Sequence, residues 1–345
     1  MQGHGRILFS IPYNGDLGLV RWASLSGQVC EVYFGGWQGC DFSSAYVGLE
    51  PLRYAEVAAL ARFCRGQGIG TNLLLNKNPL FFDDIRRIFE GVRRLSRDAG
   101  LTCVTVSDPA LVPLLRKEFP AIAVQSSIYM GVNSLVKARA AARLGVTSLC
   151  VDPEINRDFA ALKDIAGLKA AFPRLRVKLL GVLRCYQGCP YAWRHADWGV
   201  LRGVLEAWSP RGWRETLGGR LDHDRCLFES DRGADEIRRP FIRPEDLGYY
   251  ERHGLADVFK VAYREDSSER LKGVLTAYFD RRFDGNLFTL FSDEEVYAKG
   301  LVSCDNRLIP KGFVSRVMRC KGRCESCDYC ASVAKRCVRA APGSS

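Results

Sequence analysis

Histidine is scarce in this chain: only 4 of its 345 residues are histidine. The sequence has no HExxH and no GxSxG pattern, so it lacks two common peptidase and hydrolase signatures. It also has no Walker loop and no recognisable RNA-binding motif. So few imidazoles argue against a His-rich zinc or non-haem iron site and against an activated Cys or Ser nucleophile.

Long apolar runs are also missing. No run reaches the roughly 18 residues that a membrane-spanning helix needs, and the first residues lack the basic and apolar regions of a signal peptide. Hydrophobic residues make up 47% and charged residues 26% of the chain, which is typical of a globular protein. We therefore expect a cytoplasmic protein with no membrane span.

Cysteine, by contrast, is abundant, with 14 residues. A reducing cytosol keeps thiols free, so clustered cysteines in such a chain indicate metal ligation rather than disulfides. Thiolates suit iron–sulfur clusters or structural zinc. The net charge of +11 favours anionic substrates and is also compatible with RNA as a partner.

Short apolar, β-branched runs alternate with amphipathic stretches along the chain. Eight such β-α units predict an α/β fold, a TIM-like (β/α)8 barrel with its active site at the C-terminal ends of the strands. The predicted strands lie near Ile7–Ile11, Val29–Phe34, Ile69–Leu75, Cys103–Val106, Ile122–Gln125, Ser148–Val151, Val177–Val182 and Val258–Ala262.

The seventh unit is much longer than the others, which predicts a functional insertion after strand seven. We divide the chain into a barrel, residues 1–290, with a cluster-binding insertion at 184–257, and a Cys-rich, metal-binding C-terminal extension at 291–345. In the FIRPEDL segment, Arg243 and the acidic residues are expected to form a Pro-initiated helix start with a structural ion pair.

The extension contains four cysteines within eleven residues: Cys320, Cys324, Cys327 and Cys330. This spacing allows one loop to wrap a [4Fe–4S] cluster, with a four-cysteine zinc site as the alternative. Nine Lys or Arg residues between Asn306 and Arg339 would offset the charge of a tetrathiolate centre.

A second constellation follows strand seven, in the sequence CYQGCPYAWRH. Cys185 and Cys189 belong at the barrel mouth, and Cys226 returns from the insertion; these three thiolates need a fourth ligand to complete a [4Fe–4S] cluster. Cys40, just past strand two, is the best candidate, ahead of Cys304 and Cys337. His195 is either a proton donor or acceptor, or a hydrogen-bond donor to cluster sulfur.

Four ordered segments carry a family resemblance: SLCVDPEINRDFAALKDIAGL, CYQGCPYAWRHADW, FIRPEDLGYYERHGLADVFKVAYR and FDGNL. They resemble the collagenase-like peptidase U32 family, especially an iron–sulfur branch related to oxygen-independent hydroxylases of ubiquinone precursors and RNA bases. The resemblance implies a TIM-like barrel with a [4Fe–4S] cluster at its mouth. Leu183-Arg184 and Ala192 depart from the family pattern.

Polar residues at strand ends complete the candidate site. Asp152, Arg157 and Arg264 are expected at the mouth, where an arginine would hold a carboxylate or phosphate. The sequence thus favours an iron–sulfur oxidoreductase with one or two clusters, an organic, anionic substrate and an electron donor such as a ferredoxin. The alternatives are a U32-type peptidase and a non-catalytic metal-cluster protein that binds RNA.

Overall fold

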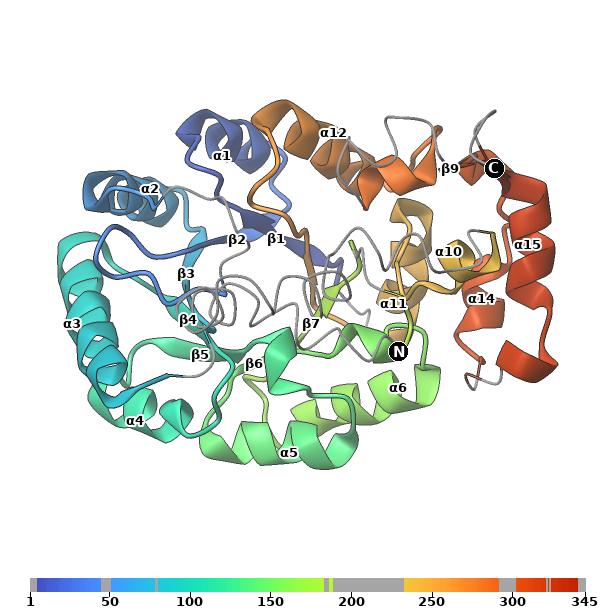
Figure 1. Ribbon diagram of the computed structural model, residues 1–345. Coiled ribbons are helices and arrows are strands. Elements are labelled where there is room, and N and C mark those ends of the chain that lie inside the picture. The colour runs from blue at the N-terminus through green and yellow to red at the C-terminus, as the bar shows by residue number, and fades with distance from the viewer. Residues whose placement is uncertain are drawn as a thin grey trace, which may run out of the picture.

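Eight parallel strands form a closed barrel at the centre of the chain (Figure 1). The structure is a computed structural model and describes residues 5–44, 51–77, 80–182, 186–188, 233–291, 302–320, 322 and 324–340. Each strand pairs with its sequence neighbours, and β1 closes the barrel on β8. The strands are β1 (Leu8–Pro12), β2 (Val29–Phe34), β3 (Gly70–Leu75), β4 (Cys103–Val106), β5 (Ala123–Ser126), β6 (Ser148–Cys150), β7 (Arg176–Leu180) and β8 (Val258–Lys260). The predicted (β/α)8 fold is confirmed.

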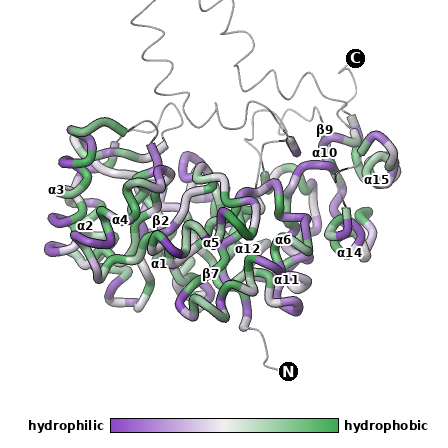
Figure 2. The backbone as a smooth tube through the Cα atoms, turned by 90° about the horizontal axis from the view of Figure 1, so that it is seen from below, coloured by the Kyte–Doolittle hydropathy of each residue, from purple (hydrophilic) through white to green (hydrophobic). Residues whose placement is uncertain are grey.

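Helices between the strands form the outer wall of the barrel, as Figure 1 shows. Their amphipathic sequences direct apolar faces to the strands, and the wall alternates between hydrophobic and hydrophilic positions in Figure 2. These helices are α1 (Leu17–Ser24), α2 (Tyr54–Gly66), α3 (Phe82–Ala99), α4 (Leu111–Glu118), α5 (Leu135–Leu144), α6 (Phe159–Gly167) and α12 (Ser268–Phe279). None of the helices in the described ranges is long and apolar enough to cross a membrane.

Side chains alternate along the strands, so each strand has an outward and an inward face. Phe9 in β1 faces outward and packs edge-on against Phe279 of α12, at 5.1 Å between ring centroids. Its neighbour Ser10 faces inward, where it donates a hydrogen bond to Glu31 of β2 at 2.6 Å. The outward positions build the apolar core, and the inward positions are polar at this level of the barrel.

The described end of the insertion leads back to the barrel through three short helical segments: α10 (Ala234–Arg238), the 3-10 turn η5 (Pro244–Asp246) and α11 (Leu247–His253). Pro244 begins η5, and Arg243 forms a buried ion pair with Asp246 at 2.8 Å. The predicted Pro-initiated helix start and structural ion pair are confirmed.

The C-terminal extension folds against this region. It contains β9 (Val302–Cys304), α14 (Phe313–Val317), α15 (Tyr329–Cys337) and β10 (Val338–Ala340), and β9 pairs with β10 in an antiparallel ladder. Helix α15 packs on α10, and Figures 1 and 2 show these elements together at one side of the barrel. The extension is therefore anchored to the described end of the insertion.

Candidate active site at the barrel mouth

Arg264 connects the loops that follow β8 and β2. Its Nη2 donates to the Ser43 hydroxyl at 2.8 Å and to the Ser44 carbonyl at 3.4 Å. Asn76, which follows β3, accepts a hydrogen bond from the Ser44 amide at 3.0 Å and donates to the Ser127 hydroxyl at 3.3 Å, after β5. Loops from four strands thus meet in one hydrogen-bonded network at the C-terminal ends of the strands, which is where active sites lie in this fold.

One nitrogen of the Arg264 guanidinium, Nη1, is buried and makes no hydrogen bond to any of the described residues. It lies against Gly35, where an added Cβ would stand only 2.5 Å from Nη1. A buried donor without a partner is costly, so this nitrogen is suited to an anionic group that enters the mouth.

Backbone strain marks the same end of β8. Tyr263, directly before Arg264, has a φ of 68°, in the left-handed region that aromatic residues rarely adopt. Such strain is retained where the surrounding structure needs that geometry, and it is concentrated at functional sites. The backbone conformation therefore supports the β8 end of the mouth as part of the site.

The barrel interior holds a buried ion pair. Lys178 of β7 and Glu31 of β2 meet at 2.5 Å between Nζ and Oε1, and only 1% of the Lys178 side chain is exposed. Burial opposes both charges, but their attraction lowers the pKa of Glu31 and raises that of Lys178. Thr105 donates to Asn72 at 2.8 Å, and Gln125 donates to Thr105 at 3.0 Å, which extends the polar lining around the barrel.

A second lysine, Lys260 of β8, has no carboxylate partner among the described residues. Its Nζ lies 4.1 Å from the centre of the Tyr33 ring. Burial, assisted by the positive charges of Lys178 and Arg264, lowers the pKa of Lys260 to about 8. Sequence reasoning missed both lysines, although each is a lone charge inside an otherwise apolar run, VKLLGV and VFKVA.

Arg157 belongs to a different network from Arg264. Its guanidinium donates to the carbonyls of Ile237 at 2.8 Å and Phe241 at 3.2 Å, and it lies 4.3 Å from the centre of the Phe241 ring and 5.1 Å from that of Phe313. Burial lowers its pKa. Arg157 thus ties the loop after β6 to the described end of the insertion and to the extension.

Asp152, the other predicted residue after β6, caps the 3-10 turn η2 (Pro153–Ile155). Its carboxylate accepts a hydrogen bond from the Glu154 amide at 3.0 Å. This is a local structural contact, and the structure does not bring Asp152 into the Arg264 network.

Three of the predicted cluster ligands, Cys185, Cys189 and Cys226, lie outside the described residues, as does His195. The three residues between Cys185 and Cys189 are described. The Tyr186 hydroxyl donates to Glu236 of α10 at 2.7 Å, and Gln187 donates to the Glu154 carbonyl at 3.1 Å. The segment between the two cysteines is therefore held between the loop after β6 and helix α10.

Cys40 lies in the loop after β2, with its thiol against α3. Its Sγ is 3.8 Å from the Arg87 carbonyl and occupies the space that a side chain at Gly91 would need. Burial raises the pKa of Cys40 to about 11. Its described surroundings are those of a packed core thiol.

The four cysteines of the extension lie between α14 and α15 and in the first turn of α15. Cys320 and Cys327 are exposed, whereas Cys324 and Cys330 are half-buried. Burial raises the pKa of Cys330, and the nearby Arg157 opposes this rise. Within the described ranges, no three Cys, His, Asp or Glu side chains are close enough together to hold a metal ion.

Cys304 and Cys337 form a separate pair in the extension. A hydrogen bond between their side chains raises the pKa of Cys304 and lowers that of Cys337. Both are buried where β9 meets β10. The two residues considered as competing cluster ligands thus contact each other.

The closed parallel barrel, with polar loops that converge at the C-terminal ends of its strands, makes this chain a TIM-barrel protein. Residues 24–171 match the model of peptidase family U32. A Methanocaldococcus jannaschii protein described as an uncharacterized protease, MJ1657, is 27% identical over 245 residues, which cover 70% of this chain and 68% of that protein. The solved structure of the U32 peptidase Mk0906 aligns with a TM-score of 0.49 at 16% identity, over 76% of this chain and 96% of that one. The family model confirms the resemblance to peptidase family U32 over residues 24–171, and the iron–sulfur branch of that resemblance stays a prediction.

Proposed function

We propose that this chain is an iron–sulfur oxidoreductase of the U32 type, which modifies an anionic organic substrate at the barrel mouth. The reaction is oxygen-independent hydroxylation or a related redox modification. One or two [4Fe–4S] clusters would supply the electron transfer. Cys185, Cys189 and Cys226 would hold the first cluster, and Cys320, Cys324, Cys327 and Cys330 the second. Cys40, the expected fourth ligand of the first cluster, packs against α3 and would join it only by leaving that position.

The observation that carries the proposal is the anchoring of the Cys185–Cys189 segment. Tyr186 between these cysteines donates to Glu236 of α10, and α10 packs on α15, which carries Cys330. The described residues between the first two cysteines and the helix that carries Cys330 thus both contact α10. This arrangement suits two redox centres that exchange electrons.

The donor chemistry of the extension fits a cluster. Four thiols occur within eleven residues; burial raises the pKa of Cys330, and the positive charges of Arg157 and Arg238 oppose that rise. Positive neighbours favour the thiolate form that ligates iron. A four-cysteine zinc site uses the same donors and is the alternative at this position.

The peptidase alternative is supported by the names of the relatives. The single histidine in the described part of the chain is His253 on α11, whose ring packs 5.3 Å from Phe159 and 4.5 Å from Tyr249. A side chain held in this way is not arranged to activate a nucleophile at the mouth.

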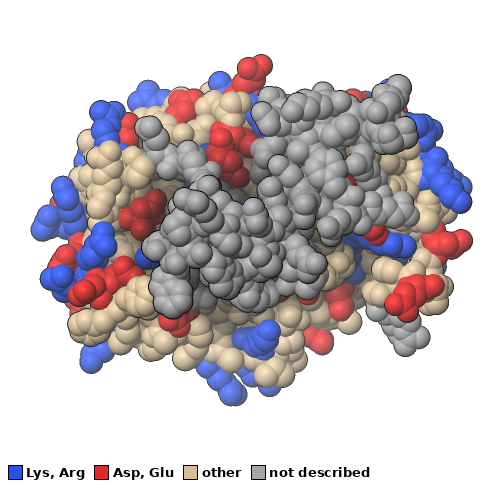
Figure 3. All heavy atoms as spheres, in the orientation of Figure 1, with Lys and Arg blue, Asp and Glu red and all other residues tan. Residues whose placement is uncertain are grey.

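The RNA-binding alternative concerns the distribution of surface charge. Figure 3 shows the described basic side chains around the rim of one face, where acidic side chains lie between them.

Anaerobic purification of the full chain tests the proposal. We expect about eight iron and eight sulfide per chain, as two cubane clusters require, with the absorption spectrum of iron–sulfur protein. Cys189→Ser and Cys327→Ser should each remove about half of the iron. Cys64→Ala, in the buried face of α2, is the matched control and should keep it all.

Other outcomes would contradict the proposal. Protein that hydrolyses peptides without iron would be a peptidase. Zinc alone, bound through the extension, would favour the non-catalytic alternative. Full iron content in Cys189→Ser would remove the mouth cluster from the assignment.

A further inference from the structure

We propose that the N-terminal end of the barrel carries a second binding site, for a small molecule that bears phosphate or carboxylate groups. This site lies at the opposite end of the strands from the mouth. It is independent of the function proposed above, and every residue that lines it belongs to the described part of the chain.

The site is a cavity of about 350 Å³ at the starts of the strands. Its origin is the small size of the inward-facing residues there, which are Gly70 in β3, Cys103 in β4, Ala123 in β5 and Ser148 in β6. TIM barrels usually fill such positions with bulky branched side chains. Four neighbouring strands with small residues therefore leave an open space where a packed layer is the rule.

The cavity is lined by an excess of positive charge. Arg116, Arg174, Arg176 and Lys178 contribute four cations, and Glu31 is the one carboxylate in the lining. Because Lys178 already pairs with Glu31, the three arginines have no acidic partner in the cavity. Arg176 is exposed at the start of β7, at the rim of the cavity, and its charge opposes the rise that burial causes in the pKa values of Cys30 and Cys103.

Arg116 is held in place at the rim. Its Nη1 donates to the carbonyls of Pro120 at 3.0 Å and Ile122 at 2.9 Å. These bonds fix the plane of the guanidinium, and within the described part of the chain its Nε and Nη2 groups donate no hydrogen bond. A fixed guanidinium with spare donors matches the planar, two-pronged recognition of an oxyanion.

The size of the cavity limits the ligand. Small-molecule sites occupy about 300–1,000 Å³, so this cavity accommodates a compact metabolite rather than a nucleic acid or a peptide. Its charge selects a molecule with at least one oxyanion. Its inner end reaches the Lys178–Glu31 pair, so a bound anion would contact the polar lining of the barrel.

Calorimetric titration of the full-length protein with inorganic phosphate and, separately, with citrate tests the site. Binding of either probe is expected, and the preferred one identifies the oxyanion class. Arg176→Ala should weaken binding about tenfold or more, because it removes a charge-assisted contact. Ala123→Leu should also weaken it, because it fills the cavity without changing any charge. A thermal melt of each variant shows that it is folded.

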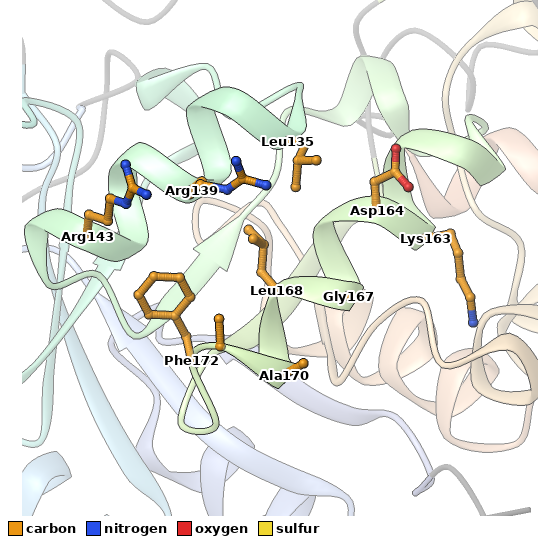
Figure 4. Close-up of a pocket in the computed structure, with 10 residues that line it drawn as sticks. Leu135, Arg139, Arg143, Lys163, Asp164, Gly167, Leu168, Ala170 and Phe172 are labelled. Carbon is orange, nitrogen blue, oxygen red and sulfur yellow. The ribbon is translucent and has the colours of Figure 1, made fainter.

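The matched control removes an arginine from another hollow of the surface. Arg143 lines a hollow between α5 and α6, on the outer wall of the barrel (Figure 4). Arg143→Ala loses the same charge and should leave binding unchanged. Equal weakening in Arg143→Ala and Arg176→Ala would reveal general charge attraction and overturn the proposal. Absence of binding by both probes, or full binding in a folded Ala123→Leu variant, would overturn it as well.

Discussion

Lys178 and Glu31 form an ion pair across the inside of the barrel, although their strands, β7 and β2, are separated by β8 and β1. Two strands that are not neighbours can make a 2.5 Å contact only through the barrel interior. Glu31 also accepts a hydrogen bond from Ser10, so the pair is connected to a third strand. The barrel interior is therefore organised around a charge pair in place of a purely apolar layer.

Removal of one partner of this pair should be strongly destabilising. Lys178→Met leaves the Glu31 carboxylate buried without its cation, and we expect a loss of about 3–5 kcal/mol in the free energy of unfolding. The double variant Lys178→Met/Glu31→Leu should lose less than the sum of the two single changes, because no charge is left unpaired. Urea denaturation of the four proteins measures this coupling, and additive losses would show that the pair is not coupled.

Replacement of Lys260 should stabilise the protein, whereas replacement of Lys178 should destabilise it. Its pKa in the folded chain is about 8, below its ordinary value of 10.5. The unfolded state therefore binds more protons between these two values, so the wild-type protein gains stability as pH rises through this window. Lys260→Met should be more stable than wild type at pH 7 by roughly 1–3 kcal/mol.

Denaturation at several pH values tests the Lys260 prediction. The advantage of Lys260→Met should be full below about pH 8 and should disappear near the ordinary lysine pKa of 10.5. Lys260→Arg, which keeps a charge, should show no such advantage. A constant difference between wild type and Lys260→Met over the whole range would mean that the lysine is not perturbed.

The positions of the strands could be predicted from the sequence because outward-facing apolar residues and Gly-containing stops mark them. Strand β2 was expected at Val29–Phe34 and occupies those residues. The polar interior was not predictable, because period and composition do not show that Lys178 and Glu31 meet across the inside of the barrel. Arg157 and Arg264 were both expected at one mouth, since both follow strands. Their separate partners depend on the insertion, the extension and the loop after β2, whose packing sequence spacing does not encode.

Gly35 should control the position of Arg264. A Cβ at position 35 would lie 2.5 Å from Nη1, so Gly35→Ala forces the end of the arginine side chain to move. If Arg264 binds the substrate anion, Gly35→Ala and Arg264→Lys should both weaken substrate binding by about tenfold, the effect of one charge-assisted contact. The measurements are the KM for an anionic substrate and the melting temperature of each variant.

Gly39→Ala is the control in the same loop, because nothing lies within 4 Å of its added Cβ. Gly39 has a φ of 81°, so the loss of stability in Gly39→Ala is subtracted from that in Gly35→Ala.

Arg157 should hold the C-terminal extension on the barrel. It donates to two carbonyls near α10 and lies against the rings of Phe241 and Phe313, and these two rings are themselves stacked at 6.2 Å. Arg157→Ala removes both hydrogen bonds and the packing of the guanidinium on the two rings, and we expect a loss of about 2–4 kcal/mol in the free energy of unfolding. Arg157→Lys should recover only part of it, because an ammonium group cannot reach both carbonyls from one plane. Hydrogen exchange should rise first in α14 and α15, while the distant strands β3–β5 stay protected.

Arg238→Ala is the control for the Arg157 prediction. It breaks a partly exposed ion pair with Asp235 in α10 and should cost less than about 1 kcal/mol. Unchanged exchange in α14 and α15 of Arg157→Ala would mean that the extension is held by its apolar contacts alone.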